Sequence, residues 1–372
     1  MPSAQSHRAW VEVEKEALLH NINALREHLE DGVAIMAVVK ANAYGHGTGT
    51  VVRSLTGSVE WFGVANVYEA KEVASIAPGS RILILGPALP EERPLIVSGG
   101  FTPIVSDLQE IQAYAALATK TPVELHLAID TGMGRMGVWE TEAVALVKAC
   151  QSISGVRITG VGSHLPVSDE DDVFTLQQIS RFRSLVQELK SMRLFDGVVH
   201  LENSAGAIGF PSDSMDIVRA GLLLYGCSPR PEFQSKLRSA LQWKTRISLI
   251  RNVSPGRTIS YGRTYTVHSP ARIATLAVGY ADGYQRHLSN RGAEVLVRGV
   301  RCPVVGRITM DQIMVDVTSV PEAQAGDPVV LIGRQENEEI TVSELAKKAG
   351  TIPWEMFTGI GQRVHRCLAP LT

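Results

Sequence analysis

The first 230 residues alternate between short runs of Val, Ile and Leu and longer segments with helical spacing, and this alternation restricts the possible folds most strongly. Near-continuous apolar runs are typical of strands that are buried on both faces, as in a parallel sheet. The apolar runs lie at residues 33–39, 61–65, 81–86, 101–106, 123–129, 157–164, 197–203 and 215–221. Residues 107–120 and 140–152 carry apolar positions three or four apart, which predicts helices.

Eight strand-then-helix units in about 220 residues are typical of a TIM (β/α)8 barrel, which usually needs about 250 residues. A doubly wound open sheet is the alternative, because periodicity does not show whether a sheet closes on itself. We therefore predict an α/β fold with an N-terminal TIM barrel over residues 1–235.

The pattern changes after about residue 235, where the strand-like pieces shorten and Gly or Pro recurs every eight to twelve residues. This texture predicts a mostly antiparallel β domain over residues 236–372. Near its end, residues 341–350 predict a short helix with Thr341 as N-cap and Glu344 at the capping-box position.

Composition argues against several classes of function. Lys plus Arg is 36 and Asp plus Glu is 38, so the net charge of −2 gives no basic surface for nucleic acid or anionic lipid. The four cysteines form no CxxC pair, so we expect neither a zinc site nor a disulfide framework. The sequence contains no run of 18 apolar residues and no signal-peptide pattern at its start. We therefore expect a soluble, cytoplasmic protein without a metal or a membrane partner.

Polar residues follow several of the predicted strands. The C-terminal ends of the strands form the active-site rim of a TIM barrel. The polar residues at these ends are Lys40, Asn66, Asp130, His164, Ser204 and Arg219, with His200 slightly earlier in its strand. We therefore place the candidate active site at this rim.

Lys40 ends the most apolar of these strands. A lysine that leaves a dry strand can lose part of its charge, which favours Schiff-base chemistry, whereas a lysine that reaches out to solvent is the structural alternative. Ser204 and Gly221 lie in the two loops where TIM barrels often bind phosphate, although a plain N-cap is the alternative for Ser204. Together with Arg219, these residues indicate pyridoxal 5′-phosphate as a cofactor.

Several motifs resemble those of the alanine racemase family. In the first domain they are VVKANAYGHG around Lys40, DTGMGRMG at 130–137, HLENSAG at 200–206 and RAGLLLYG at 219–226. In the second domain they are SYGRTY at 260–265, GYADGY at 279–284 and GRITMDQIMVDVT at 306–318. The motifs keep the family's order and cover essentially the whole chain. The resemblance implies a pyridoxal phosphate barrel and a C-terminal β domain that a first strand at about residues 8–14 joins.

The resemblance also implies two catalytic bases on opposite faces of the substrate. Lys40 would bind the cofactor and act on the D-enantiomer, and Tyr261 would act on the L-enantiomer. Because an ordinary tyrosine has a pKa of about 10, Tyr261 would need activation, and the family places His164 between it and Arg219. Arg219 would donate to the pyridine nitrogen.

The remaining roles follow from the same resemblance. The cofactor would be bound by Lys40, Tyr44, His164, Ser204, Arg219, Gly221, Leu222 and Trp354. Arg135, Met310 and Tyr280 would bind the substrate, and Asp311 would support that loop or be a simple turn carboxylate. The family also implies a homodimer in which Tyr261, Tyr280 and Met310 serve the other subunit's active site.

Three positions depart from the family pattern. Ala128 stands where many members have a carbamylated lysine, Trp354 where a phosphate-binding tyrosine is usual, and Thr309 where cysteine is also found. Alanine is the expected substrate, in a reaction that would supply D-alanine for peptidoglycan, and serine or a broader range is the alternative. Two alternatives have a different function. The chain could be a non-catalytic carrier of the cofactor, or a fold-related amino-acid decarboxylase or aldolase.

Overall fold

The computed structural model describes residues 7–211 and 215–370, which divide into two compact units. The barrel unit comprises residues 18–43 and 51–238. The β unit comprises residues 1–17, 44–50 and 239–372. Each unit is described by itself.

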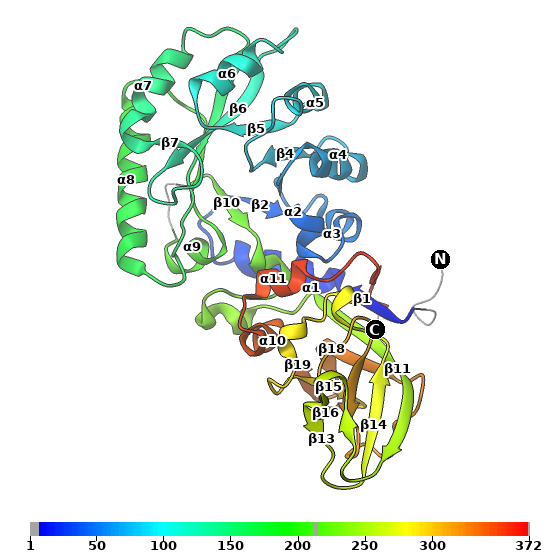
Figure 1. Ribbon diagram of the computed structural model, residues 1–372. Helices are drawn as coiled ribbons and strands as arrows, with labels where there is room; N and C mark the ends of the chain where they lie inside the picture. The colour runs from blue at the N-terminus through cyan, green and yellow to red at the C-terminus, as the bar shows by residue number, and fades with distance from the viewer. Residues whose placement is uncertain (1–6, 212–214, 371–372) are drawn as a thin grey trace. The chain divides into compact units, whose positions relative to one another are not determined.

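Parallel strands form the centre of the barrel unit (Figure 1). In sheet order they are β10 (Ile217–Ala220), β2 (Ala34–Val38), β3 (Trp61–Val64), β4 (Arg81–Ile84), β5 (Thr102–Val105), β6 (Val123–Asp130), β8 (Val156–Gly162) and β9 (Val198–His200). The two outermost strands also meet, because the Asp216 N–H donates to the Val199 carbonyl over 2.9 Å and the Arg219 N–H to the Glu202 carbonyl over 3.0 Å. The predicted TIM-like barrel is therefore confirmed, and the open-sheet alternative is wrong.

Helices follow most of the barrel strands. They are α3 (Thr48–Leu55), α4 (Val67–Ile76), α5 (Arg93–Gly99), α6 (Leu108–Ala115), α7 (Glu140–Cys150), α8 (Asp172–Ser191) and α9 (Ser204–Gly209). Helix α1 (Lys15–Arg26) precedes β2, and the two-residue strand β7 (Val138–Trp139) precedes α7. Figure 1 shows α4 to α8 outside the ring of strands. The two predicted helices are confirmed as α6 and α7, although α6 ends at Ala115, five residues before the predicted end.

The strict alternation of strand and helix fails after the last barrel strand. β10 is followed by a short 3₁₀ turn, η2 (Leu222–Tyr225), and not by an α-helix. Helix α1, which precedes β2, contacts this turn instead, because the buried Asn21 side chain donates to the Leu224 carbonyl over 3.0 Å.

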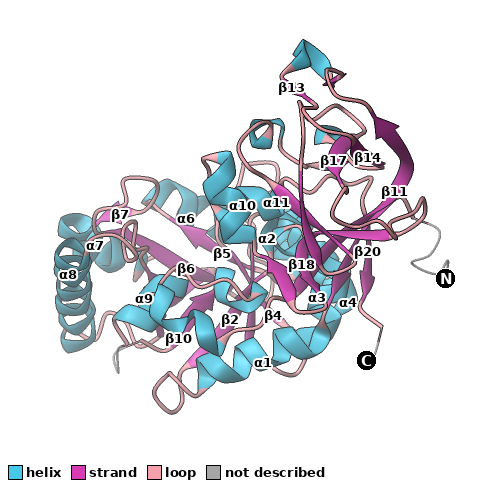
Figure 2. Cartoon of the chain, turned by 90° about the horizontal axis from the view of Figure 1, so that it is seen from below, coloured by secondary structure: helices cyan, strands magenta, loops and turns pink. Residues whose placement is uncertain are grey.

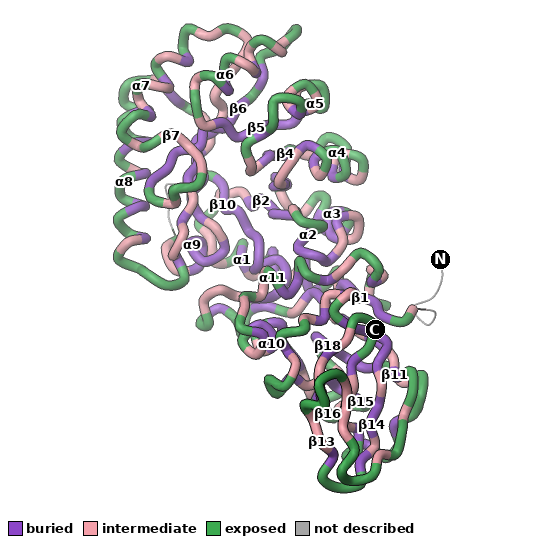
Figure 3. Tube along the Cα trace, in the orientation of Figure 1, coloured by how far each residue is buried: buried purple, intermediate pink, exposed green. Residues whose placement is uncertain are grey.

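Alternate residues of the barrel strands point inward and fill the barrel. Met36, Trp61, Leu83 and Ile217 form one buried cluster from four different strands. Figure 3 shows the strands of this unit as largely buried segments. The apolar runs of the sequence therefore report strands that are covered on both faces.

The β unit contains a mixed sheet that is mostly antiparallel (Figure 2). The strands of this sheet are β1 (Ala9–Val13), β11 (Leu241–Val253), β14 (Ala271–Leu276), β15 (Glu294–Val297), β16 (Val300–Pro303), β17 (Ile313–Asp316), β18 (Pro328–Gln335), β19 (Glu338–Ile340) and β20 (His365–Leu368). β12 (Thr258–Ile259) and β13 (Tyr265–Thr266) pair with each other in a separate two-stranded sheet. β1 pairs antiparallel with β11 and parallel with β20, so the start of the chain lies inside this sheet. Helices α10 (Val342–Ala349) and α11 (Pro353–Thr358) belong to the same unit.

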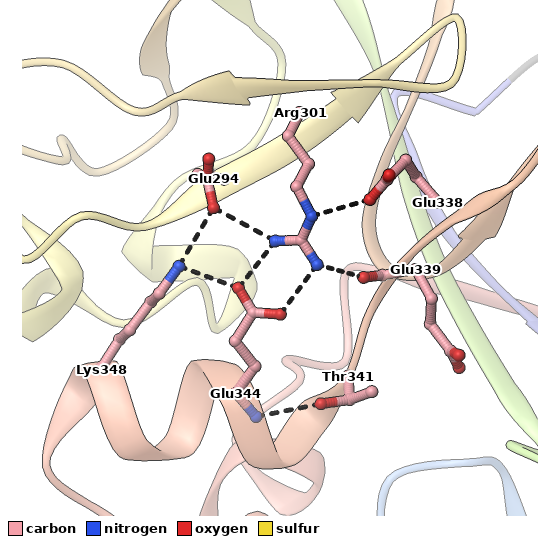
Figure 4. A network of polar contacts seen from close by, with 7 residues as sticks. All are labelled: Glu294, Arg301, Glu338, Glu339, Thr341, Glu344 and Lys348. Carbon is pink, nitrogen blue, oxygen red and sulfur yellow. Dashed lines mark hydrogen bonds and ion pairs between the residues drawn. The ribbon is translucent and has the colours of Figure 1, made fainter.

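Helix α10 begins as the sequence predicts, but its capping box is not closed. Thr341 is the N-cap, and its hydroxyl accepts the Glu344 N–H over 3.1 Å. The Glu344 carboxylate is bound by Arg301, over 2.9 and 3.1 Å, and by Lys348 (Figure 4). The reciprocal half of the box is therefore wrong, since a two-pronged guanidinium holds this carboxylate more strongly than a single backbone N–H does.

No helix within residues 7–211 and 215–370 combines the length and the apolar character that crossing a bilayer requires.

Replacing Thr341 with Ala should lower the free energy of unfolding of the β unit by about 1 kcal/mol, because one N–H at the start of α10 loses its acceptor. Thr341→Ser keeps a hydroxyl and should lose much less. Urea unfolding followed by far-UV circular dichroism measures both changes. Equal losses in the two variants would mean that the threonine methyl group, and not the cap, stabilises this helix end.

Candidate active site at the rim of the barrel

Lys40 leaves β2 through an unusual backbone turn, the segment α2 (Lys40–Tyr44). Ala41, Asn42 and Ala43 have φ angles of 53, 54 and 50°, so they form a left-handed turn. Left-handed geometry costs about 1–2 kcal/mol for each residue with a Cβ, so neighbouring contacts must hold it. The Glu69 carboxylate does so, since it accepts the Ala41 N–H over 2.8 Å and the Ala65 N–H over 2.7 Å.

The amine of Lys40 lies in a positive environment. Its pKa is lowered from the ordinary value, first by burial and then by the nearby charges of Arg135 and Arg219, while Glu69 opposes the shift. A lowered pKa makes more of the neutral amine available near pH 7. A strand-end lysine with a lowered pKa is suited to nucleophilic or proton-transfer chemistry, which is the role that the sequence analysis expects of Lys40.

Arg219 on β10 is the hub of the site, and its side chain is buried. It donates to the carbonyls of Ser163 and Leu201 over 2.7 and 2.9 Å. It also contacts Nδ1 of His200 over 2.8 Å and Nδ1 of His164 over 3.0 Å. Because a guanidinium has no acceptor, both imidazoles must accept at Nδ1.

The imidazoles around Arg219 are neutral. Burial, followed by the charge of Arg219, lowers the pKa of His164 to about 3 and that of His200 well below its ordinary value. The nearby Glu202 does not supply a negative charge, because burial raises its pKa to about 8. The guanidinium is therefore stabilised by carbonyl and imidazole dipoles and not by an ionised carboxylate.

The loop that carries Arg135 is organised by Asp130. The Asp130 carboxylate accepts the N–H groups of Gly132, Met133 and Gly134 over 2.8 to 2.9 Å. Arg135 itself is exposed and makes no hydrogen bond or ion pair with any residue that the structure describes. Its guanidinium is thus available to bind a carboxylate.

The position of the family's carbamylated lysine is occupied by Ala128, which is buried in β6. Hydrogen bonds between neutral side chains connect the residue after β6 with the residue after β8 and with α8. Thr131 contacts Ser163 over 2.8 Å, and Gln178 donates to Thr131 over 3.3 Å. Neutral side chains therefore fix the backbone between β6 and β8.

Ser204 and Gly221 come together as the sequence predicts. The Ser204 hydroxyl accepts the Gly221 N–H over 3.0 Å, and the Leu223 N–H approaches the same oxygen at 3.5 Å. The N-cap of α9 is Asn203, which accepts the Gly206 N–H over 2.9 Å. Ser204 is therefore not a plain N-cap, and it joins two loops of the rim.

The donors of this unit fit pyridoxal phosphate. Lys40 offers an amine with a lowered pKa, and Ser204 and Gly221 offer a hydroxyl and an amide for a phosphate. Among the described residues, the hydrogen bonds of Arg219 use only Nη1 and Nη2. Its Nε–H thus remains to donate to a ring nitrogen.

Tyr44 and Trp354 both belong to the β unit. Tyr44 is buried, and burial raises its pKa to about 12, so its phenol is a neutral hydrogen-bond donor at pH 7. Gly45 packs directly against α11, the helix of Trp354, because a Cβ on Gly45 would lie 2.1 Å from the Phe357 carbonyl oxygen. The β unit thus holds the Tyr44 loop beside the helix that carries Trp354.

Tyr280 and Met310 lie on two loops that are bonded to each other. The Tyr280 N–H donates to the Thr309 carbonyl, and the Ala281 N–H to the Met310 carbonyl, each over 3.0 Å. Both side chains are exposed, at 41% and 54%.

Tyr261 follows a tight turn of the β unit and is also exposed. The Ser260 hydroxyl donates to the Arg307 carbonyl over 2.5 Å and so fixes this turn. Tyr261 is 72% exposed.

Asp311 forms an ion pair with Arg363, which also binds Asp282. We therefore prefer the interpretation that Asp311 supports its loop to that of a simple turn carboxylate.

Two residues that contact the candidate site residues were missed from the sequence. Glu69 lies three residues after Asn66, which is the N-cap of α4, and that spacing was a usable signal for a capping box. Its carboxylate reaches Ala41 instead. His126 contacts His200 over 2.9 Å, and its only signal was a polar residue inside an apolar strand.

Comparison with known proteins gives one family. Residues 13–229 match the family model "Alanine racemase, N-terminal domain", and residues 240–368 match "Alanine racemase, C-terminal domain". An alanine racemase of Halothermothrix orenii is 41% identical over 363 residues, which cover 96% of each chain.

Solved structures agree with the sequence comparison. An alanine racemase of Clostridium difficile has a TM-score of 0.90 and 32% identity, covering 97% of this chain and 95% of that one. An alanine racemase of Bacillus anthracis with bound L-Ala-P has a TM-score of 0.89 and 33% identity, covering 98% and 95%.

The two charges nearest Lys40 should move its pKa in opposite directions in the cofactor-free protein. Glu69→Gln should lower the pKa of Lys40 further, and Arg135→Gln should raise it, because the first removes a stabilising anion and the second a repelling cation. Competitive acetylation across a pH series, read by mass spectrometry, measures both. Glu72→Gln on the same helix is the matched control, and shifts of one sign in both variants would contradict this electrostatic account.

Proposed function

The chain belongs to the alanine racemase family of isomerases, and we propose that it interconverts L-alanine and D-alanine with pyridoxal phosphate as its cofactor. The observation that carries this proposal is the pairing of Lys40, whose pKa is lowered, with the buried Arg219 at one rim of the barrel. A lysine to hold the cofactor and an arginine to meet its ring are the two groups that the family's reaction requires.

Bound pyridoxal phosphate makes the α-proton of an amino acid acidic by withdrawing electron density from the α-carbon. We propose that Lys40 holds and returns the proton on the face of the D-enantiomer. Tyr261 does the same on the opposite face, because one fixed base serves only one face well. His164 accepts from Arg219 at Nδ1, which leaves its Nε2–H to stabilise the phenolate of Tyr261.

Arg219 controls which reaction follows proton removal. A guanidinium donates at the ring nitrogen and keeps that nitrogen unprotonated, so the ring withdraws electrons less strongly than it would opposite a carboxylic acid. This moderation favours return of the proton to the α-carbon over transfer of the amino group. The neutral surroundings of Arg219 support this role, since burial keeps Glu202 mostly protonated at pH 7 and no carboxylate among the described residues forms an ion pair with Arg219.

We propose the other contacts from the family resemblance. Ser204, the amides of Gly221 and Leu222, Tyr44 and Trp354 would hold the phosphate. The Arg135 guanidinium and the Met310 amide would bind the substrate carboxylate, and Tyr280 would lie beside it.

We further propose a homodimer in which residues 1–235, together with Trp354, bind the cofactor. Residues 236–372, with the first strand, would supply Tyr261, Tyr280 and Met310 to the partner. The exposure of all three side chains supports this sharing.

We also propose that the protein acts in a reducing cytoplasm and that its product is D-alanine for peptidoglycan. The thiols support this compartment, because all four cysteines are free: Cys150, Cys227, Cys302 and Cys367.

The direct test is racemisation by the purified protein. We expect L-alanine to be converted to D-alanine faster than L-serine or L-lysine is converted to its enantiomer, measured by chiral chromatography. Lys40→Ala should lose nearly all turnover and the absorbance of the lysine-bound cofactor. Borohydride-stable attachment of the cofactor to a different lysine in the wild type would contradict the role of Lys40.

Tyr261→Phe should separate the two halves of the reaction. Loss of a general base costs about 10²–10⁴-fold in rate, but Lys40 remains, so D-alanine should exchange its α-proton in deuterated water faster than L-alanine appears. Proton NMR with chiral analysis measures both rates. Tyr265→Phe removes a phenol from the same segment and serves as the control. Near-wild-type racemisation by folded Tyr261→Phe would refute the two-base assignment.

A further inference from the structure

Two histidines from strands that are not neighbours meet inside the barrel. His126 lies on β6 and His200 on β9, and β8 lies between these strands in the sheet. Their ring nitrogens, Nδ1 of His126 and Nε2 of His200, are nevertheless 2.9 Å apart. Side chains on alternate strands make such a contact only where the middle strand leaves room for both.

Glycines on β8 provide this room. A Cβ on Gly160 would lie 2.5 Å from the His126 ring, and a Cβ on Gly162 would lie 2.1 Å from the His200 ring. Gly160 pairs with His126 and Gly162 with His200 in the strand register. Each imidazole therefore rests on bare backbone, and any side chain at either glycine would displace it.

A change of strand register assists the arrangement. The pairing of β6 with β8 shifts between Leu125 and His126, so that Leu125 faces Ile158 and His126 faces Gly160. Such bulges are found beside active sites, where they re-aim a side chain. Here the shift brings the first glycine opposite His126.

The direction of every hydrogen bond in this group is fixed by Arg219. Since the guanidinium only donates, Nδ1 of His200 accepts, and the proton of the neutral His200 ring sits on Nε2. That Nε2–H must donate to Nδ1 of His126. The His126 proton is then on Nε2, a buried atom with no partner among the described residues.

We propose that His126 is a positioning residue for Arg219: it accepts from His200 and thereby locks the single tautomer in which His200 can accept from Arg219. The bond to His200 is the one hydrogen bond of the His126 side chain among the described residues, and the Trp61 ring packs against it at 5.5 Å between centroids. The effect of this positioning on the choice between racemisation and amino-group transfer rests on the proposed function, in which Arg219 donates to the cofactor's ring nitrogen. The tautomer of His200 does not depend on that function.

Loss of His126 has a specific consequence. The His200 Nε2–H would be buried without an acceptor, which costs about 1–3 kcal/mol. Moving the proton to Nδ1 would relieve that cost but would bring an N–H against the N–H groups of Arg219. Either way the guanidinium loses one of its neutral acceptors, and its hold on the ring nitrogen weakens.

His126→Asn and His126→Leu form a matched pair of variants. Both new side chains have the same number of heavy atoms and branch at Cγ, but Asn places an acceptor oxygen near the position of His126 Nδ1, and Leu has none. Trp61→Phe disturbs the packing around His126 without touching the bond. If circular dichroism shows that His126→Leu does not fold, His126→Phe is used in its place.

The first measurement uses cofactor-free protein labelled with ¹⁵N-histidine. We expect wild type and His126→Asn to show His200 in one neutral form, protonated on Nε2, and His126→Leu to show a mixed or reversed tautomer. Trp61→Phe should match wild type. An unchanged His200 tautomer in His126→Leu would overturn the proposal, whatever the activity of the protein.

The second measurement uses the holoenzyme and counts half-transamination, in which alanine leaves as pyruvate and its amino group stays on the cofactor. We expect the number of these events per racemisation to rise at least about tenfold in His126→Leu and to stay near the wild-type ratio in His126→Asn and Trp61→Phe. A structural role alone would slow both reactions in parallel and leave the ratio unchanged, which would refute positioning. A wild type that racemises no alanine would refute the proposed function, and the NMR result would still decide the role of His126.

Discussion

The charge of Arg219 is buried and has no ion-pair partner among the described residues, and the rest of the site is arranged around that fact. A buried cation normally needs an anionic partner or a complete set of dipoles. Arg219 is stabilised by a set of dipoles, because two carbonyl oxygens and two imidazole nitrogens lie within 3.0 Å of its guanidinium. The two effects support each other. Burial and the positive charge of Arg219 lower the pKa values of His164 and His200, and the neutral histidines then accept hydrogen bonds from the guanidinium. An ionised carboxylate here would weaken the hold on the ring nitrogen that the proposed selectivity needs.

The same charge acts on Lys40. Arg219 and Arg135 both lower the pKa of its amine, and the burial of the strand end adds the larger effect. Arg219 would therefore act on the proposed reaction in two ways. It would reduce electron withdrawal by the cofactor's ring, and its charge helps to lower the pKa of Lys40, so that more of the amine is neutral. Glu69 opposes the shift, and its carboxylate also ties Ala41 to Ala65, so the counter-charge is placed where the backbone needs an acceptor.

The sequence predicted the parts of this structure that depend on local pattern. Strands buried on both faces read as apolar runs, so all eight barrel strands were found, and their ends located Lys40, Ser204 and Arg219. Features that depend on distant partners were missed. Glu344 follows a capping-box pattern, but Arg301, 43 residues away, takes its carboxylate. The hydrogen bond from His200 to His126 requires two glycines on a third strand, and no local pattern reports that combination.

The left-handed turn after Lys40 shows why such distant contacts are needed. Successive residues with a Cβ hold φ near 50°, at a cost of about 1–2 kcal/mol each, so the turn would unwind if left alone. Glu69 anchors its start through the Ala41 N–H, and Arg366 anchors the residues after it by donating to the Gly45 carbonyl over 3.1 Å. Gly45 has no Cβ and so avoids a clash with the Phe357 carbonyl. With its backbone held at both ends, Lys40 can present its amine to one face of a substrate repeatedly, which the transfer of a proton on a single face requires.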